Sequence, residues 1–102
     1  MKLVLQPNEM ILMAGNSQLC QPTRQVNGKL IVTNQRIYFR TLEEEHRGCD
    51  REIIPQEISD LIYFNTRWLL PFGLTIITKN GTEHQFIVRN RGEWAKLITK
   101  MY

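Results

Sequence analysis

Residues 28–39, with the sequence GKLIVTNQRIYF, constrain the fold more than any other stretch of this chain. Two short apolar runs, residues 30–32 and 37–39, are rich in β-branched and aromatic side chains, which suit a pleated strand. Between them, residues 33–35 predict a tight turn, in which Asn34 is best able to take a left-handed backbone conformation. The segment therefore predicts two short strands that fold back on each other as a β-hairpin.

The length and the apolar content of the chain predict one domain. The sequence has 102 residues, of which 42% are apolar, so residues 1–102 can build one compact core but not a second. No run approaches the roughly 20 consecutive apolar residues that span a bilayer. The apolar start, residues 1–5, is interrupted too soon by residues 6–9 to be a secretion signal. We therefore expect a soluble, cytoplasmic protein.

Charge and cysteine content narrow the classes of partner. The formal net charge is +3, from 13 Lys and Arg against 10 Asp and Glu. This mild excess is compatible with an anionic partner, but it is smaller than a dedicated nucleic-acid-binding or polybasic membrane protein carries. Cys20 and Cys49 form no Cys-x-x-Cys motif, so reduced thiols are expected.

Further strands are predicted where short apolar runs lie between turn-forming residues. These runs are residues 9–14, 51–54, 61–65, 74–78 and 83–89. Residues 15–27 lack an apolar period and predict a surface loop, and the charged residues 43–50 predict another. The dipeptide Asn80-Gly81 predicts a hairpin with a type I′ turn.

The last element changes its period from two residues to 3.6. Asn90 is placed as an N-cap, and Glu93 can reach back to its amide as in a capping box. The apolar positions that follow have the spacing of one helix face, and they are Trp94, Leu97, Ile98 and Met101. Because so short a helix is unstable alone in water, its apolar face must dock on the sheet. The pattern predicts a mainly β (α+β) fold in which a C-terminal helix covers a curved antiparallel sheet.

The order of these motifs resembles that of GRAM domains and their bacterial relatives in the pleckstrin-homology-like superfold. The resemblance covers residues 9–101, and residues 28–39 are similar to the family's G-x-L-x-x-T-N-x-R-h-x-F hairpin. Residues 54–58 are similar to its I-P-h-x-x-I motif, and residues 73–81 to its G-h-x-I-x-T-x-x-G motif. The resemblance implies a partly open antiparallel barrel of about seven strands, capped by a C-terminal helix. It also implies a non-enzymatic domain that binds membrane lipid headgroups or proteins.

Four cations, Arg24, Lys29, Arg36 and Arg40, form the first candidate site. If the strands alternate regularly, Arg36 and Arg40 share a face with Tyr38 and could meet a phosphate of an acidic lipid. The alternative is a solvated strand face whose charges pair with local glutamates. At about 1 kcal/mol per cation beside an anionic leaflet, the face predicts weak, salt-sensitive binding. Inositide-binding domains of this superfold carry several cations in the loop after their first strand, where this chain has only Arg24.

A bulky apolar connection, residues 66–73, forms the second candidate site. Its large side chains and adjacent cation are Arg67, Trp68, Leu69, Leu70 and Phe72. If exposed, the segment could enter a bilayer interface or contact another subunit. The alternative is that it folds over one end of the barrel and fills it.

Neither a metal site nor a catalytic site is predicted. His46, Cys49 and either Asp50 or Glu45 are close in sequence but lack the paired spacing of a zinc site. Ser17 and Ser59 lie in different segments from the histidines, and no catalytic or phosphate-loop motif is present. We therefore expect a binding module without a metal or cofactor, peripheral at a membrane. The expected partner is an anionic lipid headgroup or, alternatively, a protein, including a second copy of the chain, whereas nucleic acid is not expected.

Overall fold

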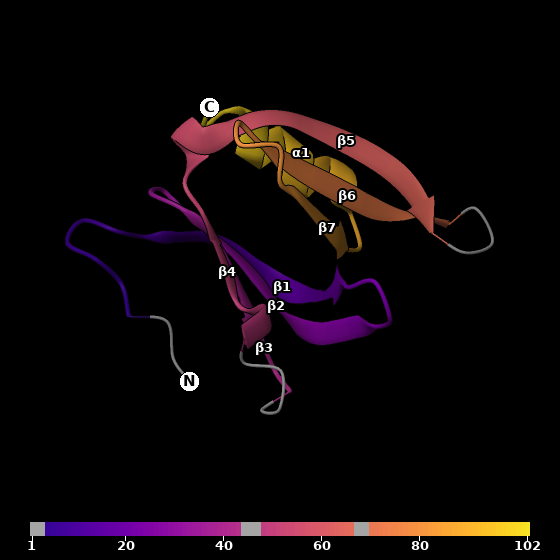
Figure 1. Cartoon of the computed structure of the whole chain (residues 1–102). Coiled ribbons are helices and arrows are strands. Elements are labelled where there is room, and N and C mark those ends of the chain that lie inside the picture. Colours follow the sequence, from indigo (N-terminus) through magenta and orange to yellow (C-terminus); the bar gives the residue numbers. More distant parts are fainter. Residues whose placement is uncertain (1–3, 44–47, 67–69) are drawn as a thin grey trace.

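The computed structural model describes residues 4–43, 48–66 and 70–102 (Figure 1). Within these residues, seven strands form one antiparallel sheet in the order β4-β3-β2-β1-β7-β6-β5. The strands are β1 Ile11–Cys20, β2 Gln25–Thr33, β3 Ile37–Thr41, β4 Arg51–Ile53, β5 Ile58–Thr66, β6 Leu70–Thr78 and β7 Glu83–Ile87. A 3-10 turn, η2, spans Pro55–Glu57, and the helix α1 spans Arg91–Thr99. The predicted mainly β fold with a single C-terminal helix is confirmed.

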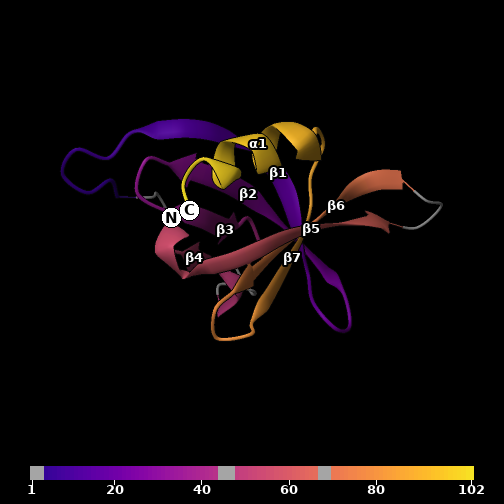
Figure 2. The same ribbon diagram turned by 90° about the horizontal axis from the view of Figure 1, so that it is seen from above.

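The sheet folds over on itself into two halves, β1–β4 and β5–β7 (Figures 1 and 2). Only two residue pairs, Gln18 with Ile87 and Leu19 with Phe86, join β1 of the first half to β7 of the second. The core lies between the halves, where the rings of Phe39 and Phe86 meet with their centroids 5.6 Å apart. Burying two such rings, each worth about 1.5–3 kcal/mol, explains why the apolar runs face inward.

Helix α1 closes the open side of the folded sheet. Trp94 and Ile98 are buried in the core and Leu97 and Met101 are half-buried against it, as the 3.6-residue period predicted, and Ala95 is buried as well. The indole of Trp94 lies against β1 at Gly15, where an added Cβ would come within 3.2 Å of Trp94 Cζ2. The helix therefore contacts both halves, through β6 on one side and β1 on the other.

The prediction of a surface loop over residues 15–27 is wrong. Strand β1 continues to Cys20 and β2 begins at Gln25, so the connection is only residues 21–24. The inward positions of these strands alternate, but several are small, because Trp94 and Phe39 occupy the space above Gly15 and Gly28. Because glycine occupies inward positions where an apolar residue would mark a strand, the sequence does not show the apolar period of two residues there.

Both predicted hairpins form, but their turns differ from the predictions. Among the described residues outside glycine, positive φ occurs at Asn8 and Asn90, and not at Asn34 or Asn80. Only Gly81, with φ of 87°, takes that conformation in the β6–β7 turn, so the turn is not type I′. The side chain of Asn80 instead accepts a hydrogen bond from the Thr82 amide at 3.0 Å, which holds the turn locally.

The predicted capping box at the start of α1 is also wrong. Asn90 has a left-handed backbone, with φ of 57°, and its side chain makes no capping hydrogen bond. The next residue, Arg91, secures the helix instead, because its Nη1 donates to the Phe64 carbonyl at 2.8 Å and its guanidinium stacks 4.3 Å above the Tyr63 ring. This tertiary contact fastens the start of the helix to β5, but it supplies no acceptor for the first helical amides.

Candidate functional site

Arg36, one of the candidate ligand residues, is buried and fully engaged within the chain. Its Nε donates to Glu9 Oε2 at 2.8 Å, and its Nη2 donates to Glu9 Oε1 at 3.1 Å and to the Val4 carbonyl at 2.9 Å. Its Nη1 donates to Glu52 Oε1 at 2.8 Å. The guanidinium therefore has two carboxylates around it, and only 9% of its side chain is exposed. We call this group, Glu9, Arg36 and Glu52, the arginine clamp.

The rest of the β2–β3 turn holds the same N-terminal segment. The Thr33 hydroxyl donates to Glu9 Oε2 at 2.6 Å, and Asn34 Oδ1 accepts from the Met10 amide at 2.8 Å. Gln35 Nε2 donates to the Pro7 carbonyl at 2.8 Å. The motif residues 33–36 thus bind the chain's own residues 4–10. Sequence reasoning missed Glu9, because a single glutamate before an apolar run does not show that it will be buried beside an arginine.

The arginine clamp predicts a defined loss of stability in acid. Its hydrogen bonds, above all those from Arg36, lower the pKa of Glu9 from 4.5 to about 2. Because the folded-state pKa lies below the unfolded-state value, the ionised carboxylate stabilises the fold above about pH 4.5, and this contribution is lost as the pH falls towards 2. We expect the difference in unfolding free energy between the wild type and Glu9→Gln, measured in urea, to shrink over that interval. The control Glu57→Gln, at an exposed glutamate of η2, should differ little from the wild type at any pH, and a constant Glu9→Gln difference would contradict the assignment.

The other three candidate cations occupy the sheet surface. Arg24 Nη2 donates to Glu43 Oε1 at 2.6 Å, in an exposed ion pair. Lys29 and Arg40 are half-buried neighbours across β2 and β3, on the face opposite the core, because their flanking residues point inward. Asn16 of β1 pairs with Lys29 on the other side, so one row across three strands carries Asn16, Lys29 and Arg40. The structure pairs Lys29 with Arg40, whereas the Arg36 guanidinium contacts Glu9, Glu52 and the Tyr38 ring, whose centroid is 5.8 Å away.

The second candidate site is described only at its flanks, because Arg67, Trp68 and Leu69 lie outside the described residues. Part of the predicted connection is strand, since β6 begins at Leu70. The ends of β5 and β6 project beyond the remainder of the sheet (Figure 2). Leu70 is 43% exposed, Pro71 is exposed and Phe72 is half-buried. We call residues 64–66 and 70–72 the hairpin end.

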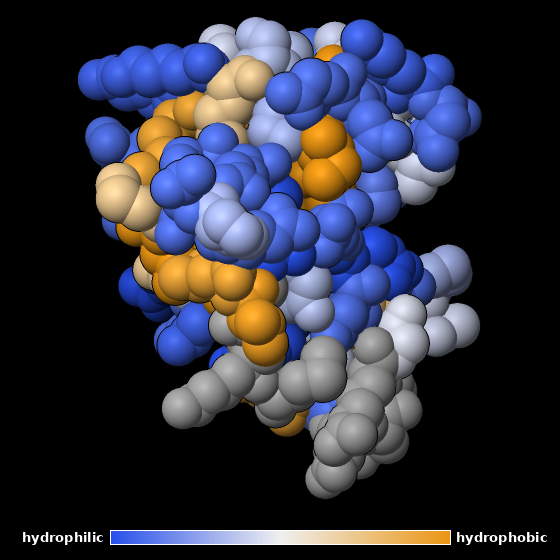
Figure 3. All heavy atoms as spheres, turned by 90° about the vertical axis from the view of Figure 1, so that its left-hand side faces the viewer, coloured by the Kyte–Doolittle hydropathy of each residue, from blue (hydrophilic) through white to orange (hydrophobic). Residues whose placement is uncertain are grey.

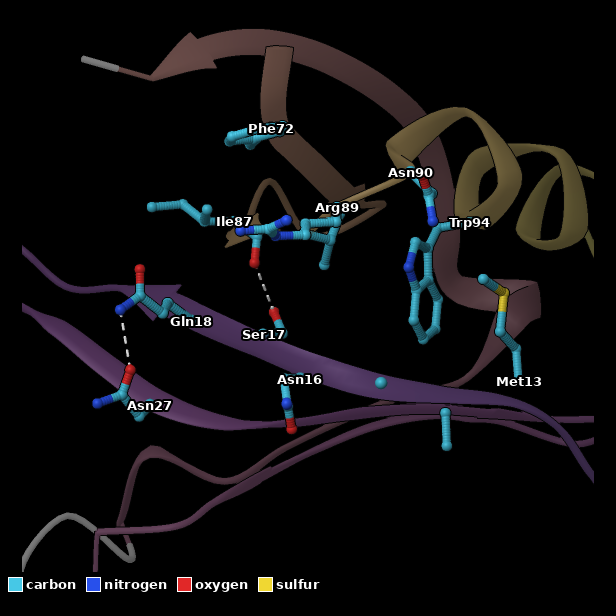
Figure 4. A pocket seen from close by; sticks show the side chains of 13 residues that line it. Met13, Asn16, Ser17, Gln18, Asn27, Phe72, Ile87, Arg89, Asn90 and Trp94 are labelled. Atoms are coloured by element: carbon cyan, nitrogen blue, oxygen red, sulfur yellow. Dashed lines mark hydrogen bonds between the residues drawn. The ribbon is translucent and has the colours of Figure 1, made fainter. Parts of the chain in front are cut away.

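A third site, which the sequence did not predict, opens where β1 separates from β7 (Figure 4). The cleft has a volume of about 560 Å³, and we call it the fork cleft. Its polar wall contains Asn16, Ser17, Arg89 and Asn90, and its apolar wall contains Phe72 and Trp94. The Ser17 hydroxyl donates to the Ile87 carbonyl at 3.1 Å, at the point where the strands part.

Arg89 is the one charged residue of the fork cleft among the described residues that line it. It is exposed, and in the part of the chain that the structure describes no carboxylate oxygen lies within 4.0 Å of its guanidinium. Because β1, β6 and the β7–α1 connection supply the walls, the site joins residues that are far apart in the sequence. A basic residue at the end of a strand carried no signal of this convergence.

The structure gives no sign of a metal site or a membrane span within its described parts. No group of three His, Cys, Asp or Glu residues is clustered there, and His46 lies outside them. Asp50 accepts hydrogen bonds from the Thr41 amide at 2.8 Å and the Tyr38 hydroxyl at 3.3 Å. Burial, with the nearby Arg51 charge, lowers the pKa of the half-buried His84. In the same residues, no helix has the length and apolar character needed to cross a bilayer.

Comparison with known proteins shows the fold. No protein-family model matches the sequence, and no curated protein is significantly similar to it. The structure is similar to the C-terminal domain of an unknown protein from Leishmania infantum, with a TM-score of 0.77 and 14% identity over 93% of this chain and 86% of that one. It is also similar to the Vps36 N-terminal PH domain, with a TM-score of 0.72 and 13% identity over 96% of this chain and 82% of that one. The chain therefore has a pleckstrin-homology-like fold.

Proposed function

We propose that this chain is a non-catalytic, GRAM-type binding module that contacts an anionic membrane surface peripherally, on the cytoplasmic side. The observation that carries the proposal is the hairpin end, where β5 and β6 project beyond the remainder of the sheet (Figure 2) and carry the exposed Leu70 and the half-buried Phe72. The pleckstrin-homology-like fold supports a binding role only in general, because one fold hosts many functions. The site must therefore supply the argument.

Two contributions act together at this end of the molecule. Full burial of a leucine or phenylalanine side chain stabilises by about 1.5–3 kcal/mol, so Leu70 and Phe72 would supply an apolar contact with the acyl boundary. Each cation near an anionic leaflet adds about 1 kcal/mol, and Arg89 lies in the fork cleft, which Phe72 also lines. In the proposal, the sequence between the two strands, Arg67-Trp68-Leu69, extends the same contact.

Replacing Leu70 by aspartate tests the proposal directly. We expect the wild type to sediment with vesicles of phosphatidylcholine and phosphatidylserine at low salt. The variant should partition about tenfold less, because it loses the burial of one leucine and adds a charge that the leaflet repels. The matched control is Leu42→Asp, which makes the same change at another exposed leucine, 58% exposed, in the β3–β4 connection.

Equal sedimentation of the wild type and Leu70→Asp would contradict the proposal, as would a wild type that ignores the vesicles. Salt provides a second criterion, because the cationic part of the contact weakens as ionic strength rises. Circular dichroism of both variants checks that the sheet remains folded.

A second candidate function is self-association or docking of a protein partner. Its specific observation is an exposed apolar surface at the end of the molecule that carries the N-terminal segment and the start of β1 (Figure 3). Its members are Val4, Leu5, Met10, Ile11 and Leu12. Light scattering after size exclusion separates the two functions, because an apolar subunit contact persists at high salt, whereas a charge-led vesicle contact does not.

A further inference from the structure

We infer that the fork cleft binds a phosphate group, with Arg89 as its principal ligand. The inference deepens the proposed function and rests on it for the source of the phosphate, which is a lipid headgroup rather than a free anion. A lipid headgroup and a free phosphate both present a compact group with one or two negative charges and several oxygen atoms that accept hydrogen bonds. The site itself is argued from its geometry and charge.

The cleft exists because the sheet comes apart at one place. Beyond the pair of Gln18 with Ile87, the N-terminal part of β1, from Ser17 back to Ile11, pairs with β2 but not with β7. The chain that follows β7 turns away into α1. Small residues, Gly15 and Ser17, form the side of β1 that faces the gap nearest the fork, and Met13 lines the cleft further along the strand. The resulting volume of about 560 Å³ exceeds what a phosphate group needs and leaves room for part of a headgroup.

The charge of the cleft has one sign. Arg89 reaches into the cleft from the end of β7, above Ser17 (Figure 4). None of the described residues that line the cleft is acidic, so its guanidinium is not neutralised there as that of Arg36 is. A planar guanidinium matches phosphate with two parallel donors, and a charge-assisted hydrogen bond is about twice as strong as a neutral one. Asn90 adds a neutral donor on the same side of the cleft, whereas the Asn16 side chain points to the other face of β1 (Figure 4).

The cations of the neighbouring strands, Lys29 and Arg40, are not among the residues that line the cleft. They share a row with Asn16 on the face of the sheet away from the core, whereas Gly15 and Ser17 face the gap. The inference therefore depends on Arg89.

The apolar wall indicates a lipid source. Phe72 lines the cleft and also belongs to the hairpin end, which the proposed function places at the acyl boundary. A phosphate held by Arg89 would therefore lie beside the residues that enter the membrane surface, at the depth of the headgroups. A phosphate on a soluble molecule would make no use of this adjacency.

Trp94 provides the readout, because its indole lines the cleft, and Trp94 and Trp68 are the tryptophans of the chain. In a Trp68→Phe background, Trp94 emission is recorded during titration with inorganic phosphate, at ionic strength matched with sodium chloride. A parallel arm uses vesicles of phosphatidylcholine with phosphatidic acid. The variants are Arg89→Gln and, as the matched loss of one exposed cation on the β6–β7 turn, Lys79→Gln.

We expect Arg89→Gln to weaken binding roughly 10- to 100-fold, the loss of one charge-assisted contact, while Lys79→Gln binds as the parent does. Arg89→Lys should recover part of the affinity, since it keeps the charge but not the paired donors. A response to the vesicles alone assigns the phosphate to a lipid, and a response to inorganic phosphate alone keeps the cleft as an anion site but removes the lipid source. The inference is overturned if neither probe changes Trp94 emission, or if Arg89→Gln responds as Lys79→Gln does.

The hairpin variant keeps the two proposals distinguishable. Leu70→Asp should lose the vesicles but retain the response to inorganic phosphate if the cleft binds the anion by itself. If instead Arg89→Gln binds both inorganic phosphate and the vesicles as the parent does, while Leu70→Asp still abolishes vesicle sedimentation, the cleft assignment fails and the membrane proposal stands.

Discussion

Replacing Arg36 by methionine should lower the free energy of unfolding by about 3–5 kcal/mol, the cost of leaving a buried charge without its partner. The side chain of Glu9 is 0% exposed, and it receives two hydrogen bonds from this one guanidinium. Without the guanidinium, Glu9 must either remain charged in the protein interior or take up a proton. The N-terminal segment would also lose the hydrogen bond that its Val4 carbonyl accepts. Urea denaturation at neutral pH measures the loss.

The matched control is Arg24→Met, which breaks an ion pair of similar geometry at the surface. The Arg24 side chain is 50% exposed, so its pair with Glu43 should contribute no more than about 1 kcal/mol. The double variant Arg36→Met/Glu9→Met should recover much of the stability, because it removes both charges together. A loss at Arg36 as small as that at Arg24 would show that the clamp does not organise the N-terminal segment.

Replacing Gly28 by alanine should lower the free energy of unfolding by about 3 kcal/mol, at the upper end of the usual cost of overpacking. Gly28 begins the sequence motif, and the ring of Phe39 lies directly over it. An added Cβ would lie 2.3 Å from Phe39 Cζ and 2.6 Å from the Arg40 carbonyl oxygen. Since Phe39 is fully buried and Arg40 contributes backbone, neither can move without disturbing the β2–β3 pairing. Thermal and urea unfolding would both record the change.

Gly48→Ala is the corresponding control. No heavy atom of the described residues lies within 4 Å of a Cβ built at Gly48. The substitution should therefore be neutral or stabilise by about 0.4–1 kcal/mol, because alanine reduces the freedom of the unfolded chain. If Gly28→Ala behaved like Gly48→Ala, the steric reason for glycine at the start of the motif would be wrong.

The variants Arg36→Met and Gly28→Ala both test how the motif of residues 28–39 is interpreted. Its glycine makes room for Phe39, and its residues 33–36 hold the N-terminal segment. The motif is therefore a structural element of the fold. In our proposals, the residues that contact a ligand lie elsewhere, at the hairpin end and in the fork cleft.

The candidate sites show the limit of strand parity as a guide. Alternation correctly placed Arg40 on the face away from the core, because the pleat requires it. It could not show that residues 4–10 fold back over Arg36, since that contact depends on side-chain hydrogen bonds across 27 residues. The fork cleft was missed for the same reason, since its walls come from β1, β6 and the start of α1.

The sequence by itself determined the two hairpins of residues 28–39 and 74–89, the other short apolar strands and the amphipathic helix, but not the β1–β2 pairing over residues 15–27. These follow from local periodicity and from turn residues, and neighbours along the chain carry that information. Tertiary structure decided which charges are neutralised and where the sheet opens. Burial beside Glu9 turned Arg36 into a structural residue, and divergence of two strands left Arg89 with space around it. Both outcomes depend on distances between segments remote in sequence, and no local pattern encodes such distances.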